Sequence, residues 1–389
     1  MNVGVVSYSL EGEAQAKPKA VLLLITAACN LKCKYCYETH KKNLLMEEAT
    51  AKQIIANELS RANDTVIEFI YMGGEPLLAF GLIRTVSTWA WCNFPNNRFY
   101  FSLRTNGTLL TKEIAEWLLT NKERINVGLS LDGIQMVQYK NRGTLNGEIN
   151  IDFFVKNWPN MIIKATIFKD TVDTLYDSVV FFHKNGYHAH FSLGEGFVWD
   201  EMSVNVLASE YDKIIDYAIR HPDWKDWDGV FTMKPEQFYL NASSSALPYC
   251  GLSNGITAYW TTGEKYSCHM MTPMVLGDDL SSKFLNYNMP KKINVDVECR
   301  NCPIIQQCKN CVAMNIKIMG AIEKSAAYRT TCAAQKTLAR ASALLFLTRL
   351  QNILVHGDVD IDEKVKIGQK CLRLLKDFPR PQGVSNEAK

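Results

Sequence analysis

The sequence contains no hydrophobic run long enough to cross a membrane, and it carries little net charge. No segment approaches the roughly 18 continuous apolar residues that a spanning helix needs. The formal charge of +3 arises from 43 lysines and arginines against 40 aspartates and glutamates. This excess is too small and too evenly spread to indicate binding to nucleic acid or to an anionic membrane surface. We therefore expect no nucleic acid and no membrane among its partners.

The chain also lacks the features of an export signal. The apolar run "AVLLLITAA" precedes three closely spaced cysteines, so it resembles at first sight a signal peptide with a lipid-attachment site. A signal peptide begins with a basic segment close to the N-terminus. Here Glu11 and Glu13 precede Lys17 and Lys19, and the apolar run begins only at Ala20. The pattern favours a cytoplasmic protein over an exported one.

Cysteine, by contrast, is abundant, with 12 residues. The cytoplasm keeps thiols reduced, which makes disulfides a poor explanation, and clustered cysteines indicate metal or redox chemistry. Cys92 and Cys371 stand alone in apolar helical patterns, and we expect both to be buried, inert thiols. The remaining cysteines form a first group of Cys29, Cys33 and Cys36, and a second group of Cys250, Cys268, Cys299, Cys302, Cys308, Cys311 and Cys332.

The first two hundred residues alternate short apolar runs with amphipathic stretches. The apolar runs predict strands over residues 20–28, 66–74, 98–107, 125–133, 161–168 and 187–195. The amphipathic stretches predict helices that include residues 47–62, 80–94, 112–122 and 207–220. Such alternation favours an α/β fold with a parallel sheet covered by helices. Six units favour a partial (β/α)6 barrel of the TIM type, although an open doubly wound sheet also fits the pattern.

The composition changes after about residue 222, where loop-like and then cysteine-rich segments begin. An apolar helix is predicted over 335–355, and the last residues are polar. We therefore predict five parts, which are an N-terminal extension (1–19), the partial barrel (20–222), a linker or substrate-shaping region (223–248), a small cysteine-rich domain (249–334), and C-terminal helices with a frayed tail (335–389).

The first cysteine group has the spacing C-x3-C-x2-C and follows the first predicted strand. Active sites of parallel α/β barrels lie at the carboxyl ends of the strands. Three thiolates are one ligand fewer than a closed zinc site or iron–sulfur cluster requires. His40 is the nearest candidate for a fourth ligand, but it lies beyond the motif in a polar turn. The motif therefore predicts a metal centre with one open position.

The stretch "CNLKCKYC" resembles the signature of radical S-adenosylmethionine (radical SAM) enzymes. That resemblance implies that Cys29, Cys33 and Cys36 hold a [4Fe-4S] cluster whose open iron is chelated by S-adenosylmethionine. Further segments that are similar to family landmarks follow in order at predicted strand ends: "MGGEP", "RTNGT", "SLDG" and "KNRG". The residues that this resemblance assigns to cofactor binding are Tyr35, Gly73, Gly74, Glu75, Asn106, Ser130, Asp132 and Arg142.

Six of these assignments have a chemical reason. Gly73 and Gly74 allow a close approach of the backbone, and the Glu75 carboxylate can accept from the methionine ammonium group. Asp132, like Ser130, can bond the ribose hydroxyls or the amino-acid end, and Arg142 can clamp the carboxylate. Taken singly, these segments are ordinary turns and surface charges. Their order along successive strands favours the cofactor site.

The second cysteine group resembles the SPASM extension, which binds two auxiliary [4Fe-4S] clusters in its relatives. The resemblance implies one cluster on Cys299, Cys302, Cys308 and Cys332. It implies a second on Cys250, Cys268 and Cys311, which lacks one cysteine ligand. Only Lys309 and Asn310 separate Cys308 from Cys311, where the usual pattern has three residues. A zinc-binding knot is the alternative, because C-x2-C pairs also suit tetrahedral zinc.

The resemblance implies an enzyme that cleaves S-adenosylmethionine reductively and abstracts hydrogen from a peptide or protein substrate. We expect a maturase of ribosomal peptides that forms a thioether or carbon–carbon cross-link, with flavodoxin or ferredoxin as electron donor and a separate leader-binding protein as a further partner. The enzymatic alternatives are an anaerobic sulfatase-maturating, formylglycine-generating enzyme and a peptide epimerase. His269 stands where the sulfatase-maturating branch has its aspartate base, so it is either the acid/base or a structural histidine. An iron–sulfur or zinc carrier is the non-enzymatic alternative.

Overall fold

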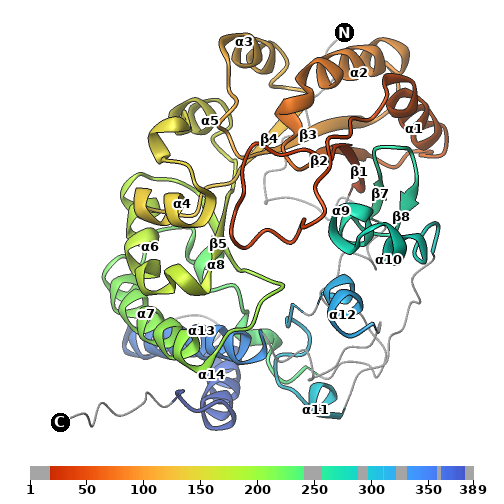
Figure 1. Cartoon of the computed structure of the whole chain (residues 1–389). Helices are drawn as coiled ribbons and strands as arrows, with labels where there is room; N and C mark the ends of the chain where they lie inside the picture. Colours follow the sequence, from red (N-terminus) through yellow and green to blue (C-terminus); the bar gives the residue numbers. More distant parts are fainter. Residues whose placement is uncertain are drawn as a thin grey trace.

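The computed structural model describes most of the chain, and its helices and strands are labelled in Figure 1. The described residues are 18–240, 256–287, 297–309, 311–320, 331–356 and 361–381. Cys250 therefore lies outside the described residues, as do nearly all of the predicted N-terminal extension and the end of the tail.

All six predicted barrel strands are present. They are β1 (Lys19–Thr26), β2 (Ile67–Gly73), β3 (Phe99–Thr105), β4 (Ile125–Leu129), β5 (Ile163–Ile167) and β6 (Ala189–Leu193). Neighbouring strands pair in parallel from β1 to β4 and from β5 to β6, and a single bridge between Ser130 and Lys164 joins the two sets. Strands that follow one another in space as in sequence form a barrel, whereas a doubly wound sheet reverses its order. The predicted partial barrel is confirmed.

Helices cover the outside of this curved sheet (Figure 1). They are α1 (Glu48–Ser60), α2 (Phe80–Asn93), α3 (Lys112–Thr120), α4 (Gln135–Arg142), α5 (Ile151–Asn157), α6 (Leu175–Lys184) and α7 (Glu201–Arg220). Helix α7 begins earlier than its apolar pattern predicted, because the Asp200 carboxylate accepts from the Ser203 N–H and caps its first turn.

Strand residues alternate between the helices and the interior of the barrel. On β3, Phe101 and Leu103 are fully buried beneath the helices, and the Phe101 ring stacks on Tyr71 of β2 with centroids 5.1 Å apart. Ser102 and Arg104, which alternate with them, line the interior instead. This period of two gives the barrel an apolar outer layer and a polar inner face.

The cysteine-rich region begins by extending the barrel sheet. Strand β7 (Thr257–Tyr259) pairs in parallel with β1, and β8 (Lys265–Tyr266) pairs antiparallel with β7. The Tyr259 hydroxyl donates to the buried Glu58 carboxylate of α1 at 2.6 Å, and Lys19 forms a salt bridge with the same group. The hairpin thereby covers the edge of β1, which would otherwise present unpaired backbone groups.

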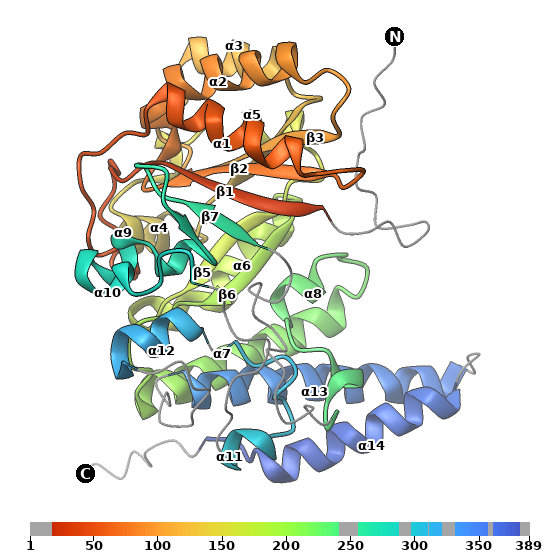
Figure 2. The ribbon, with the colours of Figure 1, turned by 90° about the vertical axis from the view of Figure 1, so that its right-hand side faces the viewer.

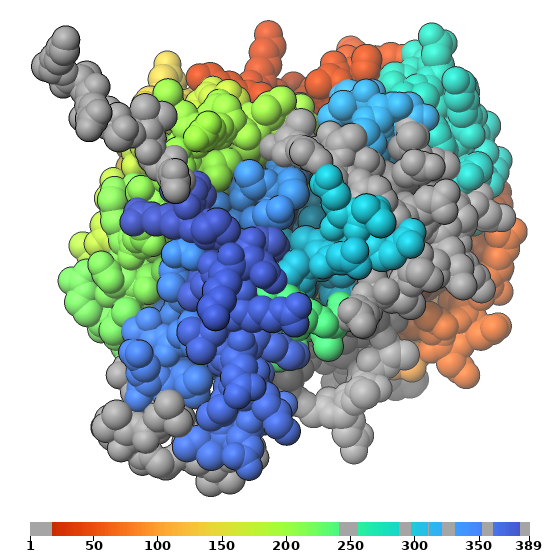
Figure 3. Space-filling view, turned by 90° about the horizontal axis from the view of Figure 1, so that it is seen from below, coloured from red at the N-terminus to blue at the C-terminus, as the bar shows by residue number. Residues whose placement is uncertain are grey.

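The remaining helices lie beyond the barrel. They are α8 (Trp227–Val230), α9 (Pro273–Leu276), α10 (Asp278–Ser282), α11 (Val297–Arg300), α12 (Val312–Met319), α13 (Cys332–His356) and α14 (Ile361–Asp377). Figure 2 shows α13 and α14 side by side beneath α7, against which α13 packs. Seen from below, these two C-terminal helices cover much of the surface (Figure 3).

The structure corrects one prediction about an isolated cysteine. Cys371 is fully buried as predicted, but Cys92 is exposed. The buried face of α2 carries Ile83, Val86 and Ala90. Cys92 is two residues beyond Ala90, and a helical step of two residues points away from the core. Among the described residues, no helix is both long and apolar enough to cross a membrane.

Candidate active site

A cavity of about 1550 Å³ occupies the interior of the partial barrel. Its walls extend from the loop after β1 to the loops that precede β3, β4 and β5, where Asn96, Lys122 and Asn160 lie. The residues singled out from the sequence that line this one cavity are Cys29, Cys33, Tyr35, Cys36, Gly73, Gly74, Glu75, Asn106, Ser130, Arg142 and His269.

The loop between β1 and α1, residues 27–47, carries the first cysteine group and is called the cysteine loop here. Its three cysteines are half-buried and form no disulfide. Lys41 Nζ lies 3.0 Å from Cys36 Sγ, and the Leu31 N–H donates to Cys29 Sγ at 3.4 Å. Burial raises the pKa of Cys33 to about 11, so a metal that binds there must displace a proton. Within the described residues, no three His, Cys, Asp or Glu side chains are arranged to hold a metal ion.

The two glycines after β2 allow the strand end to pack against the cysteine loop. A Cβ atom at Gly74 would lie 2.2 Å from the Ala28 carbonyl oxygen and 2.8 Å from Cys29 Cβ. Gly73 has a φ of +133°, a conformation that side chains disfavour. The backbone N–H groups of Gly74 and Glu75 donate to Thr26 and Ala28 at 3.1 and 2.9 Å. The predicted close approach is therefore made to the chain that bears the cysteines.

Glu75 is buried at the junction of β2 and β3. Its Oε1 accepts from the Leu77 N–H at 3.0 Å and the Thr105 hydroxyl at 2.7 Å, and its Oε2 accepts from the Asn106 N–H at 2.8 Å. Burial raises the pKa of this carboxyl group. One acceptor position on Oε2 remains for a ligand in the cavity.

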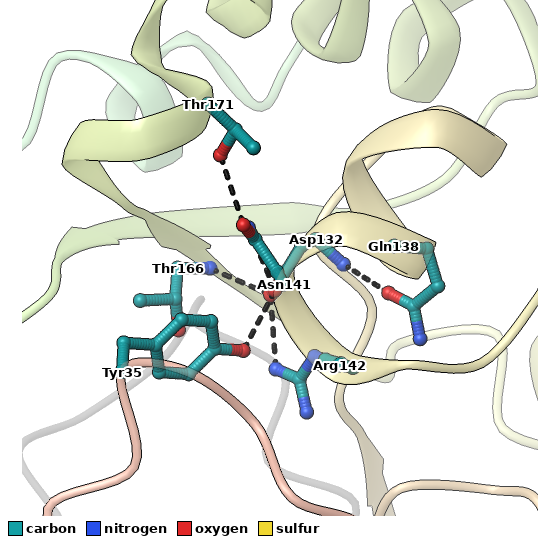
Figure 4. Close-up of polar contacts among 7 residues, drawn as sticks. All are labelled: Tyr35, Asp132, Gln138, Asn141, Arg142, Thr166 and Thr171. Carbon is teal, nitrogen blue, oxygen red and sulfur yellow. Dashed lines mark hydrogen bonds and ion pairs between the residues drawn. The ribbon is translucent and has the colours of Figure 1, made fainter.

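Asp132 is the centre of a buried network (Figure 4). Its Oδ1 accepts from Arg142 Nη2 at 2.9 Å and from the Thr166 N–H at 3.1 Å. Its Oδ2 accepts from the Tyr35 hydroxyl at 2.7 Å and from Asn141 Nδ2 at 3.2 Å. Asp132 is not part of the cavity wall. The sequence predicted a direct contact with the cofactor, whereas the structure uses both oxygens to join the cysteine loop, β4, α4 and β5.

Arg142, in contrast, faces the cavity while Asp132 holds it in place. Its guanidinium group lies 5.4 Å from the centre of the Tyr35 ring. Its buried Nε atom has no hydrogen-bond partner among the described residues. A buried donor without a partner costs free energy unless a ligand satisfies it, so the structure leaves a donor for an acidic group here.

The other two predicted cofactor residues, Asn106 and Ser130, differ in the hydrogen bonds that their side chains form. The Asn106 side chain donates to Asn30 Oδ1 at 2.9 Å and accepts from Thr108, so its oxygen already has partners. Ser130 lines the cavity, and its hydroxyl bonds to no other described residue.

His269 lies between the two cysteine groups. Its Nε2 is 3.3 Å from the Tyr37 hydroxyl, and its Nδ1 is 3.7 Å from Cys268 Sγ. Burial, and then the nearby charge of Lys164, lowers the pKa of His269 to about 4. The imidazole is therefore neutral at pH 7. Tyr37 was missed from the sequence, although its place directly after Cys36 could have drawn attention to it.

The second cysteine group divides between two hydrophobic clusters. Cys302 and Cys308 pack against the large barrel core, whereas Cys268 and Cys311 pack against the smaller core beside β1 and β7. This division parallels the two ligand sets implied by the resemblance.

Sequence reasoning also missed several charged residues inside the barrel. Arg104, Lys164 and His190 line the cavity, and Glu195 and Lys309 lie close enough to interact with Lys164. A single charged residue inside the apolar strand patterns "FSLRT" and "IKATI" was the available signal.

Comparison with known proteins agrees with this geometry. Residues 23–142 match the model of the Radical SAM superfamily. A cysteine-type anaerobic sulfatase-maturating enzyme of Clostridium perfringens is 35% identical over 127 residues, which is 30% of this chain and 33% of that enzyme. The chain spans between about a third and two fifths of the length of the first curated relatives it matches.

Two solved structures share the fold over most of the chain. Native anSMEcpe with bound AdoMet and the Cp18Cys peptide has a TM-score of 0.60 at 18% identity, covering 87% of this chain and 99% of that one. Streptococcus suis SuiB bound to the precursor peptide SuiA has a TM-score of 0.54 at 15% identity, and the match covers 80% of this chain and 75% of that one. Residues 23–142 are therefore similar to the Radical SAM superfamily, and the chain shares the fold of these two solved structures.

Proposed function

We propose that this chain is a radical SAM peptide maturase. The observation that carries the proposal is the shared cavity, into which the cysteine loop, the strand end at Gly74 and Glu75, and the Arg142 guanidinium all project. The residues fit the cofactors, because three thiols that form no disulfide and an unsatisfied buried donor face one space. When bound at Cys29, Cys33 and Cys36, the cluster with S-adenosylmethionine supplies a 5′-deoxyadenosyl radical that abstracts hydrogen from an unactivated carbon.

The protein residues would hold and orient the cofactor. The free position on Glu75 Oε2 suits the methionine ammonium group, and Arg142 Nε suits its carboxylate. Ser130 offers a hydroxyl to the ribose, and Gly73 and Gly74 keep the strand end close to the cysteine loop. Asp132 acts as a positioning residue, because it fixes Arg142 and Tyr35 without facing the cavity.

The cysteine-rich region would hold the auxiliary clusters. We assign one to Cys299, Cys302, Cys308 and Cys332, and the other to Cys250, Cys268 and Cys311. The packing of Cys302 and Cys308 on one core and of Cys268 and Cys311 on another supports this separation. The domain limits 20–222 for the barrel and 249–334 for the SPASM domain belong to the same proposal.

A peptide substrate is supported by the solved structures that share this fold. Two proteins with this fold have been solved with peptides, the Cp18Cys peptide and the precursor SuiA. We propose cross-linking of a ribosomal peptide as the reaction, with a flavodoxin or ferredoxin as electron donor and a separate leader-binding protein.

Sulfatase maturation is the second candidate, favoured by the match to the Clostridium perfringens enzyme. In that case His269 would take the proton from the substrate. A neutral imidazole in the cavity wall can accept a proton, and Tyr37 would hold it through Nε2.

The test is anaerobic incubation of reconstituted, reduced protein with S-adenosylmethionine. The wild type should form 5′-deoxyadenosine, and Cys33→Ala should abolish that product while most iron is retained. Cys92→Ala is the matched control, because Cys92 is exposed and outside the cavity, and it should behave as the wild type. No 5′-deoxyadenosine from the wild type, or loss of all iron in Cys33→Ala, would contradict the proposal.

A further inference from the structure

Two basic side chains project into the barrel interior from strands on either side of β4. Arg104 lies on β3 and Lys164 on β5, and both are exposed to the cavity that also contains the cysteine loop. Neither side chain forms a hydrogen bond or salt bridge with another described residue. Two cations that line one cavity and keep their donors free can bind a ligand with negative charge.

The intervening strand places the two cations near each other. Arg104 pairs in register with Gly128 of β4. A Cβ atom at Gly128 would lie 2.2 Å from Arg104 Nη1 and 2.9 Å from its Cδ, so the Arg104 side chain lies directly over this glycine of β4. The backbone of Lys164 is held to the same strand end, because the Leu131 N–H donates to its carbonyl oxygen at 3.1 Å.

The carboxylates near these cations are mostly engaged elsewhere. Glu68 accepts from the Ser102 hydroxyl, and Glu75 accepts three hydrogen bonds. Asp132 forms its salt bridge with Arg142. Two carboxylates of the cavity wall, Glu68 and Glu75, are therefore committed to other donors, as is Asp132 behind the wall.

Glu195, at the end of β6, is the carboxylate that interacts with Lys164. Lys309 also interacts with Glu195. It approaches from the cysteine-rich region, and its Nζ lies 3.4 Å from the Ser192 hydroxyl. Burial, followed by the repulsion from Arg104, lowers the pKa of Lys164. Burial and the charge of Lys164 likewise lower the pKa of Lys309. Among the described residues, Glu195 therefore faces the charges of Lys164 and Lys309, and Arg104 adds a further cation beside Lys164.

We propose that Arg104 and Lys164 bind a carboxylate group of the peptide substrate. The guanidinium fork can hold both oxygens of a carboxylate, and the ammonium group adds a third charge-assisted hydrogen bond. The group is an aspartate or glutamate side chain or a free C-terminus, and the experiment separates these sources. This inference rests on the proposed peptide substrate and specifies its chemistry.

The experiment compares three short probes on the reconstituted full-length protein with S-adenosylmethionine bound. The probes are acetyl-Gly-Glu-Gly-amide, acetyl-Gly-Gln-Gly-amide and acetyl-Gly-Gln-Gly with a free carboxylate, and their dissociation constants are measured calorimetrically. The wild type should bind one of the acidic probes about tenfold more tightly than the neutral probe. Preference for the glutamate probe identifies a side-chain carboxylate, and preference for the free acid identifies a C-terminus.

Variants assign the preference to the two cations. Arg104→Met and Lys164→Met should each reduce the preference about threefold, and the double variant should abolish it, with iron content unchanged as the check on folding. Lys112→Met is the matched control, because Lys112 is a 90% exposed cation on α3, and it should keep the preference.

Three results would overturn the inference. They are equal binding of all probes to the wild type, a preference that survives in the double variant, and a loss of S-adenosylmethionine affinity in the variants with the peptide preference intact. The last result would assign the cations to the cofactor. Formation of 5′-deoxyadenosine is measured in the same samples, and its absence in the wild type would refute the proposed function itself.

Discussion

Replacing Asp132 with asparagine tests the buried network that joins the cysteine loop to β4 and β5. The Asp132 and Arg142 side chains are 0% and 8% exposed, and each carboxylate oxygen accepts two hydrogen bonds. The asparagine NH2 group would face two donors in either orientation, and the Arg142 charge would remain buried without a counter-charge. Removing one partner of a buried ion pair costs about 3–5 kcal/mol.

Urea unfolding of anaerobically prepared protein, followed by tryptophan fluorescence, measures this loss. The matched control is Asp152→Asn, because Asp152 forms an exposed i,i+4 pair with Lys156 at 3.6 Å. We expect the control to lose less than about 0.5 kcal/mol. In Asp132→Asn with Arg142→Met, the unpaired charge is also removed, so the loss should be smaller than the sum of the two single losses. If Asp132→Asn were no more destabilising than Asp152→Asn, the network would not hold the loop.

Two further predictions concern the cysteine loop and the sheet edge. Gly74→Ala should destabilise the protein by about 1–3 kcal/mol, because its Cβ would meet a backbone oxygen at 2.2 Å. Gly147→Ala meets nothing within 4 Å and should be neutral by urea unfolding; equal effects would refute the steric argument. Burial opposes ionisation of Glu58, but hydrogen bonds from Lys19 and Tyr259 outweigh it and lower the pKa. The free energy of unfolding of the wild type should therefore exceed that of Glu58→Gln above about pH 4.5. This difference should disappear as the pH falls through the lowered pKa, and a difference that stays constant across this range would contradict the reasoning.

Local sequence patterns were sufficient to predict the barrel. Apolar runs and helical periods are properties of neighbouring residues, so strands such as Lys19–Thr26 and Phe99–Thr105 were predicted to within two residues at each end. The cysteine loop was predicted for the same reason, because C-x3-C-x2-C is a local spacing. Strand β7 was not, since its pairing with β1 joins residues more than 230 positions apart.

What the individual side chains contact was decided by the tertiary structure. The motif around Asp132 predicted that it belongs to the site, but only the fold shows four donors from separate elements converging on its oxygens. Tyr37 and His269 come together because the cysteine-rich region packs against the cysteine loop. Arg104 and Lys164 become neighbours because Gly128 leaves room on the strand between them. The sequence alone determines which residues face the barrel interior, because side chains alternate along a strand with a period of two. Which charged groups become their neighbours depends on the pairing of strands that are far apart in the sequence.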